Sequence, residues 1–335
     1  MRRFTAVFLV ALFSVTALSH ALTMQWVGVT RVMPVQQHGH LAVSGSKLVS
    51  QNGEVVSFAG PSFFWSNTGW GQEAFYNTQA VRNFARDWDA DIIRASIGVD
   101  GDGSLLRDPQ ANMARAETII QAAIANNIYV VVDYHSHEAE KSVPQAQEFF
   151  AYLAQKYGHT PNIIYEIYNE PLVSTDWDTV IKPYAETMIQ TIRRYDPDNI
   201  IVVGTQSYSQ DLERVIANPI RGASNIMYAL HFYAAGHKDD LRARAERALQ
   251  AGLPVMVTEW GTVNYDGDGA VDRASSEAWL ALMRRHDLTH MMWAVSSKNE
   301  GASMFTSTAS KTGPWTDADL TSSGRYARDI IKGWK

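Results

Sequence analysis

Residues 163–171 read Ile-Ile-Tyr-Glu-Ile-Tyr-Asn-Glu-Pro, and this stretch is typical of a buried β-strand. Apolar and β-forming residues fill most of its positions, and Pro171 ends it because proline cannot donate to a β-ladder. Glu166 interrupts the apolar pattern, and the pair Asn169-Glu170 stands at the end of the strand. An amide and a carboxylate are thus placed side by side at the end of an otherwise apolar strand, and the rest of the sequence indicates why.

A strand-then-helix pattern repeats eight times after residue 54. Strands are predicted over 55–65, 91–97, 128–135, 162–169, 200–204, 225–233, 254–260 and 291–295. Helices are predicted over 75–88, 113–126, 145–157, 180–195, 211–217, 239–251, 275–286 and 322–334. Eight such units in about 280 residues predict an α/β fold of the (β/α)8 TIM-barrel type.

An open doubly wound sheet is the alternative fold. No Gly-x-Gly-x-x-Gly follows the first strand and no P-loop is present, which disfavours a nucleotide-binding version of that fold. Before the first strand, apolar segments flank Gln51-Asn52-Gly53, a hairpin turn signal. We therefore expect a short N-terminal β-hairpin as a floor beneath the barrel.

The first 21 residues have the features of a secretory signal peptide. Arg2 and Arg3 precede an uncharged run over residues 4–18, and Ser19-His20-Ala21 places small residues at a cleavage site. The run is 15 residues long, whereas a membrane span needs about 20, so an uncleaved anchor is the less favoured reading. We expect a secreted protein, periplasmic or extracellular, with a leader segment at 22–40 and a single barrel domain at 41–335.

Charge and cysteine content exclude several classes of function. Removing residues 1–21 leaves 27 basic and 35 acidic residues, a formal charge of −8, whereas nucleic-acid binding calls for a basic surface. The absence of cysteine excludes disulfides, thiol catalysis and cysteine metal sites. We expect a monomer that binds neither nucleic acid nor, once the signal peptide is removed, a membrane.

Polar side chains gather at the predicted strand ends, where (β/α)8 barrels carry their chemistry. They are Arg94, Asp133, His135, Asn169, Glu170, His231, Tyr233, Glu259, Trp260 and Trp293. Each alone has an ordinary structural explanation as a cap, an ion-pair member or a core residue, but a barrel directs all of them to one opening. Glu170 and Glu259 lie on strands across the barrel, and glycoside cleavage needs one protonated acid and one ionised carboxylate.

With these residues the sequence resembles glycoside hydrolase family 5, in particular its bacterial endo-β-1,4-glucanases (cellulases), from about Leu41 to Trp334. The resemblance rests on six segments in order, at 92–95 (Ile-Ile-Arg-Ala), 133–135 (Asp-Tyr-His), 167–171 (Ile-Tyr-Asn-Glu-Pro), 230–234 (Leu-His-Phe-Tyr-Ala), 258–261 (Thr-Glu-Trp-Gly) and 293–300 (Trp-Ala-Val-Ser-Ser-Lys-Asn-Glu). It implies a retaining mechanism without cofactor or metal, with Glu259 as nucleophile and Glu170 as acid and base.

The resemblance also implies supporting roles. Arg94 and Tyr233 would hold Glu259, Asn169 would bind a sugar 2-hydroxyl, and His135 and His231 would contact sugar hydroxyls or orient the acid. The residues expected to bind the β-1,4-glucan substrate are Trp65, Trp177, Tyr208, Trp293, Lys298 and Glu300. For Tyr208, as for Trp70, packing and sugar contact stay open, and the loop at 61–70 departs from the commoner family pattern.

Three other functions compete with this interpretation. A β-mannanase or another β-glycanase would use the same two glutamates, and only the resemblance of Lys298 and Glu300 favours glucan. A sugar-binding protein without catalysis would not need both carboxylates. A metal-dependent hydrolase is the third, because His135-Ser-His137 resembles a metal-binding His-x-His pair.

Overall fold

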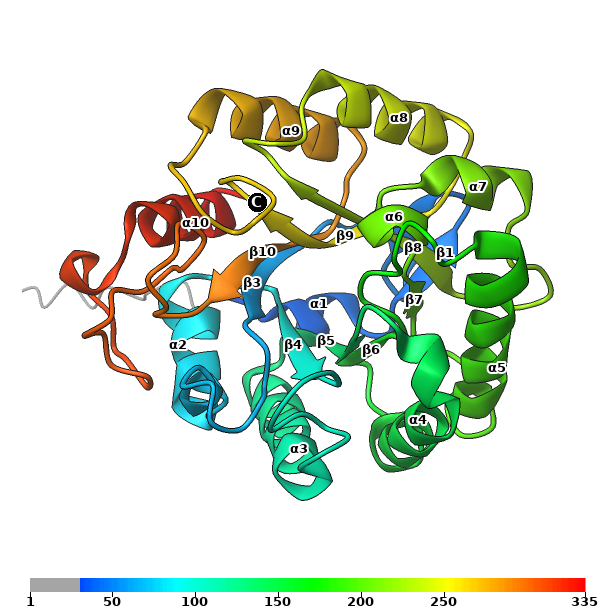
Figure 1. Ribbon diagram of the computed structural model, residues 1–335, viewed down its shortest axis with the longest axis horizontal. Helices are drawn as coiled ribbons and strands as arrows, with labels where there is room; N and C mark the ends of the chain where they lie inside the picture. The colour runs from blue at the N-terminus through cyan, green and yellow to red at the C-terminus, as the bar shows by residue number, and fades with distance from the viewer. Residues whose placement is uncertain (1–30, 335) are drawn as a thin grey trace, which may run out of the picture. The chain divides into compact units, whose positions relative to one another are not determined.

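The computed structural model describes residues 31–334, so the predicted signal peptide and most of the predicted leader lie outside it. In the described range, parallel strands close into a barrel in the order β10-β3-β4-β5-β6-β7-β8-β9 (Figure 1). The strands are β3 (Ala59–Phe63), β4 (Ile92–Gly98), β5 (Tyr129–His135), β6 (Ile163–Glu166), β7 (Ile201–Val203), β8 (Ile226–Tyr233), β9 (Val255–Gly261) and β10 (His290–Val295). The predicted (β/α)8 barrel is confirmed.

Helices surround the barrel strands (Figure 1). They are α2 (Thr78–Asp87), α3 (Pro109–Asn126), α4 (Val143–Tyr157), α5 (Lys182–Arg193), α6 (Gln206–Ser209), α7 (Leu212–Ala217), α8 (Asp239–Gln250), α9 (Arg273–Arg285) and α10 (Ser322–Lys332). Side-chain caps start several of them: Asn77, Asp272 and Thr321 each accept a hydrogen bond from the first helical turn. None of the helices in residues 31–334 is both long enough and apolar enough to cross a bilayer.

A small N-terminal unit fills the amino-terminal end of the barrel. It consists of α1 (Pro34–His38) and a hairpin of β1 (Ala42–Ser44) and β2 (Lys47–Val49). Leu41 and Leu48 pack in one cluster with the barrel-interior residue Ile92. The predicted floor is therefore present, and burial of its apolar side chains explains its position.

Helix α1 lies within the predicted leader segment at 22–40, for which no secondary structure was predicted. One detail of the predicted floor is wrong. The hairpin turn falls at Gly45-Ser46, where Gly45 has a φ of +61°, and not at Gln51-Gly53. Residues 51–53 form a second tight turn closed by an isolated bridge between Val49 and Val55. Residues 45–46 and 51–53 both have the composition of a turn. Which of them joins the two strands of the hairpin depends on strand pairing, which the turn residues do not specify.

Alternation along the strands separates two cores. On β4, Ile92 faces the barrel interior whereas Ile93 packs under the helices, and on β5 Val131 and Val132 divide in the same way. The interior is apolar near the floor. Farther along the strands the same interior positions carry Arg94, Asp133 and other polar residues, so the period of two that fills the core also delivers charge to the opposite end.

Strand β9 contains one extra residue relative to both neighbours. Ala229 pairs with Met256 and His231 with Glu259, so two steps on β8 match three on β9, and the same shift occurs against β10. A bulge of this kind re-aims side chains. As a result, the consecutive residues Thr258 and Glu259 both reach interior partners.

Candidate active site

A pocket of about 270 Å³ lies at the carboxyl ends of the barrel strands. It is lined by Phe64, Trp65, His135, His137, Asn169, Glu170, Tyr233, Glu259, Tyr265, Asp266, Gly267, Trp293, Lys298 and Glu300. A larger pocket of about 580 Å³ lies on the outer surface between α3 and α4, with mainly apolar walls. The smaller pocket is the candidate active site because titratable groups converge in it.

Glu259 is held by donors on both of its carboxylate oxygens. Arg94 donates from Nη1 to Oε2 at 2.9 Å, and the Tyr233 hydroxyl donates to Oε1 at 2.7 Å. The Glu259 side chain is only 5% exposed. The guanidinium offers donors and no acceptor, so this position suits an ionised carboxylate in a fixed orientation.

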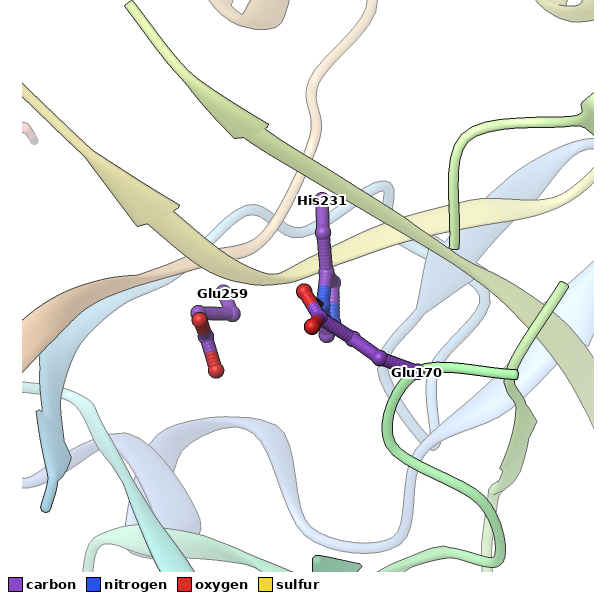
Figure 2. Close-up of side chains that lie close together, drawn as sticks. All are labelled: Glu170, His231 and Glu259. Atoms are coloured by element: carbon purple, nitrogen blue, oxygen red, sulfur yellow. Dashed lines mark hydrogen bonds and ion pairs between the residues drawn. The ribbon is translucent and has the colours of Figure 1, made fainter. Parts of the chain in front are cut away.

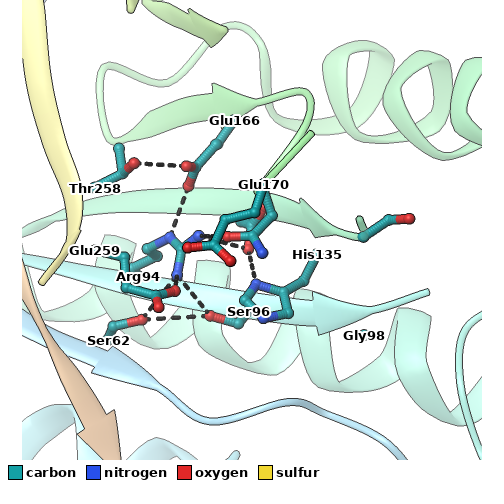
Figure 3. A network of polar contacts seen from close by, with 12 residues as sticks. Ser62, Arg94, Ser96, Gly98, His135, Glu166, Glu170, Thr258 and Glu259 are labelled. Carbon is teal, nitrogen blue, oxygen red and sulfur yellow. Dashed lines mark hydrogen bonds and ion pairs between the residues drawn. The ribbon is translucent and has the colours of Figure 1, made fainter. Parts of the chain in front are cut away.

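Arg94 is the centre of a buried polar network (Figure 3). Besides Glu259, it donates from Nε to Glu166 at 2.7 Å and from Nη2 to Asn169 Oδ1 at 2.7 Å, and Nη2 lies 2.9 Å from Asp133 Oδ2. One guanidinium therefore faces three carboxyl groups in a fully buried setting. Such a cluster is stable only while every charge keeps its partner.

Burial and Arg94 act in opposite directions on the two inner carboxyl groups. Burial, the largest single effect, would raise the pKa of Glu166, but the charges and hydrogen bonds of Arg94 and His231 together lower that pKa to about 2. For Asp133 burial dominates, and its pKa lies well above the usual range despite Arg94. The cluster thus accommodates its excess of acidic groups because the pKa of Glu166 is lowered while that of Asp133 is raised.

Asn169 and His135 are oriented by the same network. The amide oxygen of Asn169 accepts from Arg94, which leaves its Nδ2 group to donate to a ligand. His135 Nδ1 lies 2.5 Å from Asp133 Oδ2, and burial, the largest cause, lowers the pKa of His135 to about 3. We assign the neutral tautomer with hydrogen on Nδ1, so Nε2 is an acceptor. Trp293 stacks on this ring at 5.4 Å between centroids.

Glu170 lies just beyond a strand that is shorter than predicted. Strand β6 ends at Glu166 rather than near residue 169. Hydrogen bonds replace the missing ladder: the backbone of Glu170 donates to Ser136 O at 3.2 Å, and Ser209 Oγ donates to Asn169 O at 2.7 Å. These two hydrogen bonds tether the backbone of Asn169 and Glu170 after the strand has ended.

The carboxyl group of Glu170 lies between two histidines. His231 Nδ1 is 3.0 Å from Oε1, and His137 Nε2 is 3.3 Å from Oε2. Burial alone would raise the pKa of Glu170, but hydrogen bonds from His137 and His231 lower it below its usual range. Burial would lower the pKa of His231, yet hydrogen bonds to Glu166 and Glu170 raise it to about 9.

The hydrogen bonds of His231 fix its tautomer. Thr258 donates its hydroxyl hydrogen to Glu166 at 2.6 Å, so its oxygen is free to accept from His231 Nε2 at 2.8 Å. Nε2 therefore carries hydrogen. Only Nδ1 can gain or lose a proton, and the partner it faces is Glu170. We conclude that His231 and Glu170 share one proton.

Most residues predicted to bind substrate lie in or beside the pocket. Trp65, Trp293, Lys298 and Glu300 line it, and Lys298 Nζ pairs with Glu300 Oε2 at 2.7 Å. Trp70, whose role stayed open, stacks on Trp65 at 5.7 Å and is 40% exposed. Tyr208 is equally exposed and meets His137 edge-on at 6.2 Å, outside the lining set.

The prediction that Trp177 binds substrate is wrong. Its side chain is fully buried, its Nε1 donates to Asn218 O at 2.9 Å, and its ring packs against Tyr228. The predicted loop is instead a π-helical turn, Trp177–Ile181, with both end residues in the core. The large apolar ring of Trp177 is more stable packed in the core than exposed at the surface.

Sequence reasoning assigned no role to several members of the network. Asp133 was counted among the strand-end residues and Glu166 was noted as an interruption of its strand, whereas Ser62, Ser96 and Thr258 were not considered individually. Alternation of period two would have placed both on the interior face, Asp133 with His135 and Glu166 with Ile164, because alternate residues share a face. Thr258 has no such signal, since its inward direction depends on the bulge in β9. His137 was considered only as a metal ligand.

The proposed metal pair does not assemble. Within residues 31–334, the group that brings three potential ligands within 4.8 Å of one another is Glu170, His231 and Glu259. It includes neither His135, whose Nδ1 contacts Asp133, nor His137, whose Nε2 contacts Glu170. The cluster instead reflects the convergence of two carboxyl groups and the histidine that shares a proton with one of them (Figure 2).

Two facing carboxyl groups at the mouth of a barrel, one fixed by arginine and tyrosine and the other paired with histidines, define the site of a glycoside hydrolase. The family model for cellulase (glycosyl hydrolase family 5) matches residues 49–299. The chain belongs to glycoside hydrolase family 5.

Individual relatives agree with this assignment. Endoglucanase Z of Dickeya dadantii is 45% identical over 295 residues, which cover 88% of this chain and 66% of the relative, just under two thirds of its length. A structure from Cytophaga hutchinsonii has a TM-score of 0.87 at 43% identity, covering 90% of this chain and 97% of that one. The catalytic domain of Thermobifida fusca endoglucanase Cel5A has a TM-score of 0.85 at 33% identity, covering 90% and 100%, and a variant of it was solved with cellotetraose.

Proposed function

We propose that this protein is an exported endo-β-1,4-glucanase that hydrolyses internal bonds of a β-glucan with retention of configuration. The observation that carries the mechanism is the spacing of the two carboxyl groups. An oxygen of Glu170 and an oxygen of Glu259 lie within 4.8 Å of each other. Retaining glycosidases have carboxyl groups about 5–5.5 Å apart, whereas inverting ones need roughly 6.5–9.5 Å to admit water between them.

In the first step Glu259 attacks the anomeric carbon and the glycosidic bond breaks. Arg94 and Tyr233 keep the attacking carboxylate oriented. The leaving oxygen takes the proton held by the His231–Glu170 pair, which passes along the 3.0 Å hydrogen bond to Glu170 and from there to the leaving group. The product is a glycosyl ester on Glu259 and a released chain end.

In the second step Glu170 acts as a base. It removes a proton from the water that attacks the glycosyl ester, which restores the shared proton and frees Glu259. The two inversions give net retention. Asn169 Nδ2 and the Nε2 acceptor of His135 are placed to bind sugar hydroxyls throughout, because their other atoms are committed to the network.

The substrate class rests on the relatives and on the lining of the pocket. Relatives named endoglucanase and the cellotetraose complex of the Thermobifida variant support a β-1,4-glucan. Trp65 and Trp293 offer aromatic faces at the pocket, and such faces suit the apolar faces of sugar rings.

The function is tested on protein recovered after export, where mass spectrometry should show Leu22 as the first residue. Carboxymethylcellulose should lose viscosity faster than reducing ends appear, whereas mannan and xylan should be poor substrates. In cellotetraose hydrolysis followed by proton NMR, the β-anomer should appear before mutarotation. Early α-anomer would contradict the retaining mechanism, and preferential cleavage of mannan would replace the substrate.

A tryptophan pair tests the corrected substrate-binding set. Trp177→Phe should lower the free energy of unfolding by about 1–3 kcal/mol, since it removes a buried hydrogen bond and volume. KM should stay unchanged. Trp65→Ala should do the reverse, raising KM for cellotetraose by about 10-fold while stability changes little. Urea unfolding and steady-state kinetics measure both, and a raised KM in Trp177→Phe would return this residue to the binding site.

A further inference from the structure

His137 occupies a position that the proposed mechanism does not yet use. Its Nε2 is 3.3 Å from Oε2 of Glu170, opposite the oxygen that faces His231. The two histidines differ in exposure: the side chain of His231 is 1% exposed and that of His137 is 40% exposed. One oxygen of the acid–base glutamate is thus held from inside the barrel and the other from the solvent side.

Several contacts besides the one to Glu170 hold His137 in its position. Its backbone N–H donates to Asp100 Oδ2 at 3.2 Å, and its carbonyl accepts from the Tyr168 hydroxyl at 3.0 Å. The ring is flanked by Trp65 at 5.9 Å and Tyr208 at 6.2 Å, both edge-on. These contacts come from different parts of the chain: they hold the backbone of His137 and place two aromatic rings beside an imidazole whose Nε2 faces Glu170.

The charged groups near His137 are acidic. Asp100 lies at its backbone, Glu170 at its Nε2, and Glu259 across the pocket. The hydrogen bond to Glu170 is the largest cause that raises the pKa of His137. Glu170 in turn faces His137, His231 and Glu259. A protonated His137 is therefore well placed beside an ionised Glu170.

We propose that His137 is a positioning residue for the acid–base glutamate: it holds Oε2 of Glu170 at the pocket mouth and, when protonated, favours the ionised carboxylate that activates water. This inference rests on the proposed retaining mechanism. It assigns the two histidines different tasks, since His231 shares the catalytic proton whereas His137 stabilises the base.

Hydrolysis of the glycosyl ester isolates this role. With 2,4-dinitrophenyl β-cellobioside the leaving group needs no acid, so the second step limits kcat and Glu170 must be ionised. Removing His137 removes the hydrogen bond that, with His231, lowers the pKa of Glu170. The acid limb of the kcat–pH profile should therefore move to higher pH, by about one unit in His137→Leu.

The variants are His137→Leu, His137→Gln and, as a control, the exposed His159→Leu. His137→Gln keeps a neutral donor, so it should retain more cellotetraose activity than His137→Leu, which should lose about 10-fold in kcat/KM. Both should show the shifted acid limb, and the control neither effect. An unshifted acid limb with only KM raised on both substrates would overturn the inference and leave His137 as a sugar contact. A wild-type enzyme inactive on both substrates would instead overturn the proposed function.

Discussion

Replacing Glu259 by glutamine should reduce kcat on carboxymethylcellulose by roughly 10⁴–10⁶-fold, the scale on which loss of a catalytic nucleophile acts. Glutamine keeps the shape of the side chain: its amide oxygen can still accept from Arg94, and its amide nitrogen can donate to the Tyr233 hydroxyl, so the fold should remain. The change removes only the anionic oxygen that attacks the anomeric carbon. Glu54→Gln, at an exposed position, is the matched control and should behave as wild type.

Azide distinguishes the roles of the two glutamates. In Glu259→Ala, azide can enter the space of the missing carboxylate and should restore activity on an activated aryl cellobioside, giving the α-glycosyl azide by one inversion. In Glu170→Ala the glycosyl ester still forms, and azide should replace water to give the β-glycosyl azide. The same anomer from both variants would refute the assignment of nucleophile and acid–base residue.

Replacing Arg94 by methionine should destabilise the protein by roughly 3–5 kcal/mol, because breaking a buried ion pair leaves charge without compensation. Arg94 is fully buried and faces Asp133, Glu166 and Glu259. Activity should collapse as well, since Glu259 loses one of its two donors. Arg247→Met is the control: Arg247 pairs with Glu213 at the surface, and exposed pairs contribute only about 0–1 kcal/mol.

The loss in the Arg94 variant should depend on pH. The folded-state pKa of Glu166 is lowered to about 2, so its contribution is present above its unfolded pKa and is lost as pH falls toward 2. In the variant the unpaired carboxylates can protonate in acid, which relieves the folded state. The difference in unfolding free energy between wild type and variant should therefore be larger at pH 7 than at pH 4.5. An equal difference at both pH values, measured by urea unfolding, would show that lost packing rather than charge causes it.

Local patterns were sufficient for the barrel and for the two central glutamates. Apolar residues recur with a period of two in the short strand segments and of 3.6 in the helical segments between them. These periods indicate which face of each element is buried, and they can be seen without knowing which strands pair. Glu170 and Glu259 stand out at the ends of apolar strands for the same reason. The misassigned hairpin turn and the misassigned Trp177 mark the limit, because a turn signal or an aromatic residue does not state what packs against it.

By itself the sequence determined that eight strands alternate with helices and that polar side chains collect at one end of them. Only the tertiary structure decided which of these side chains contact one another and which of them are ionised. The extra residue in β9 turns both Thr258 and Glu259 inward, and Arg94 is shared among three carboxyl groups. His231 on β8 and His137 in the loop after β5 both contact Glu170. Strand register and ionisation depend on contacts between residues far apart in the chain, and no local pattern encodes them.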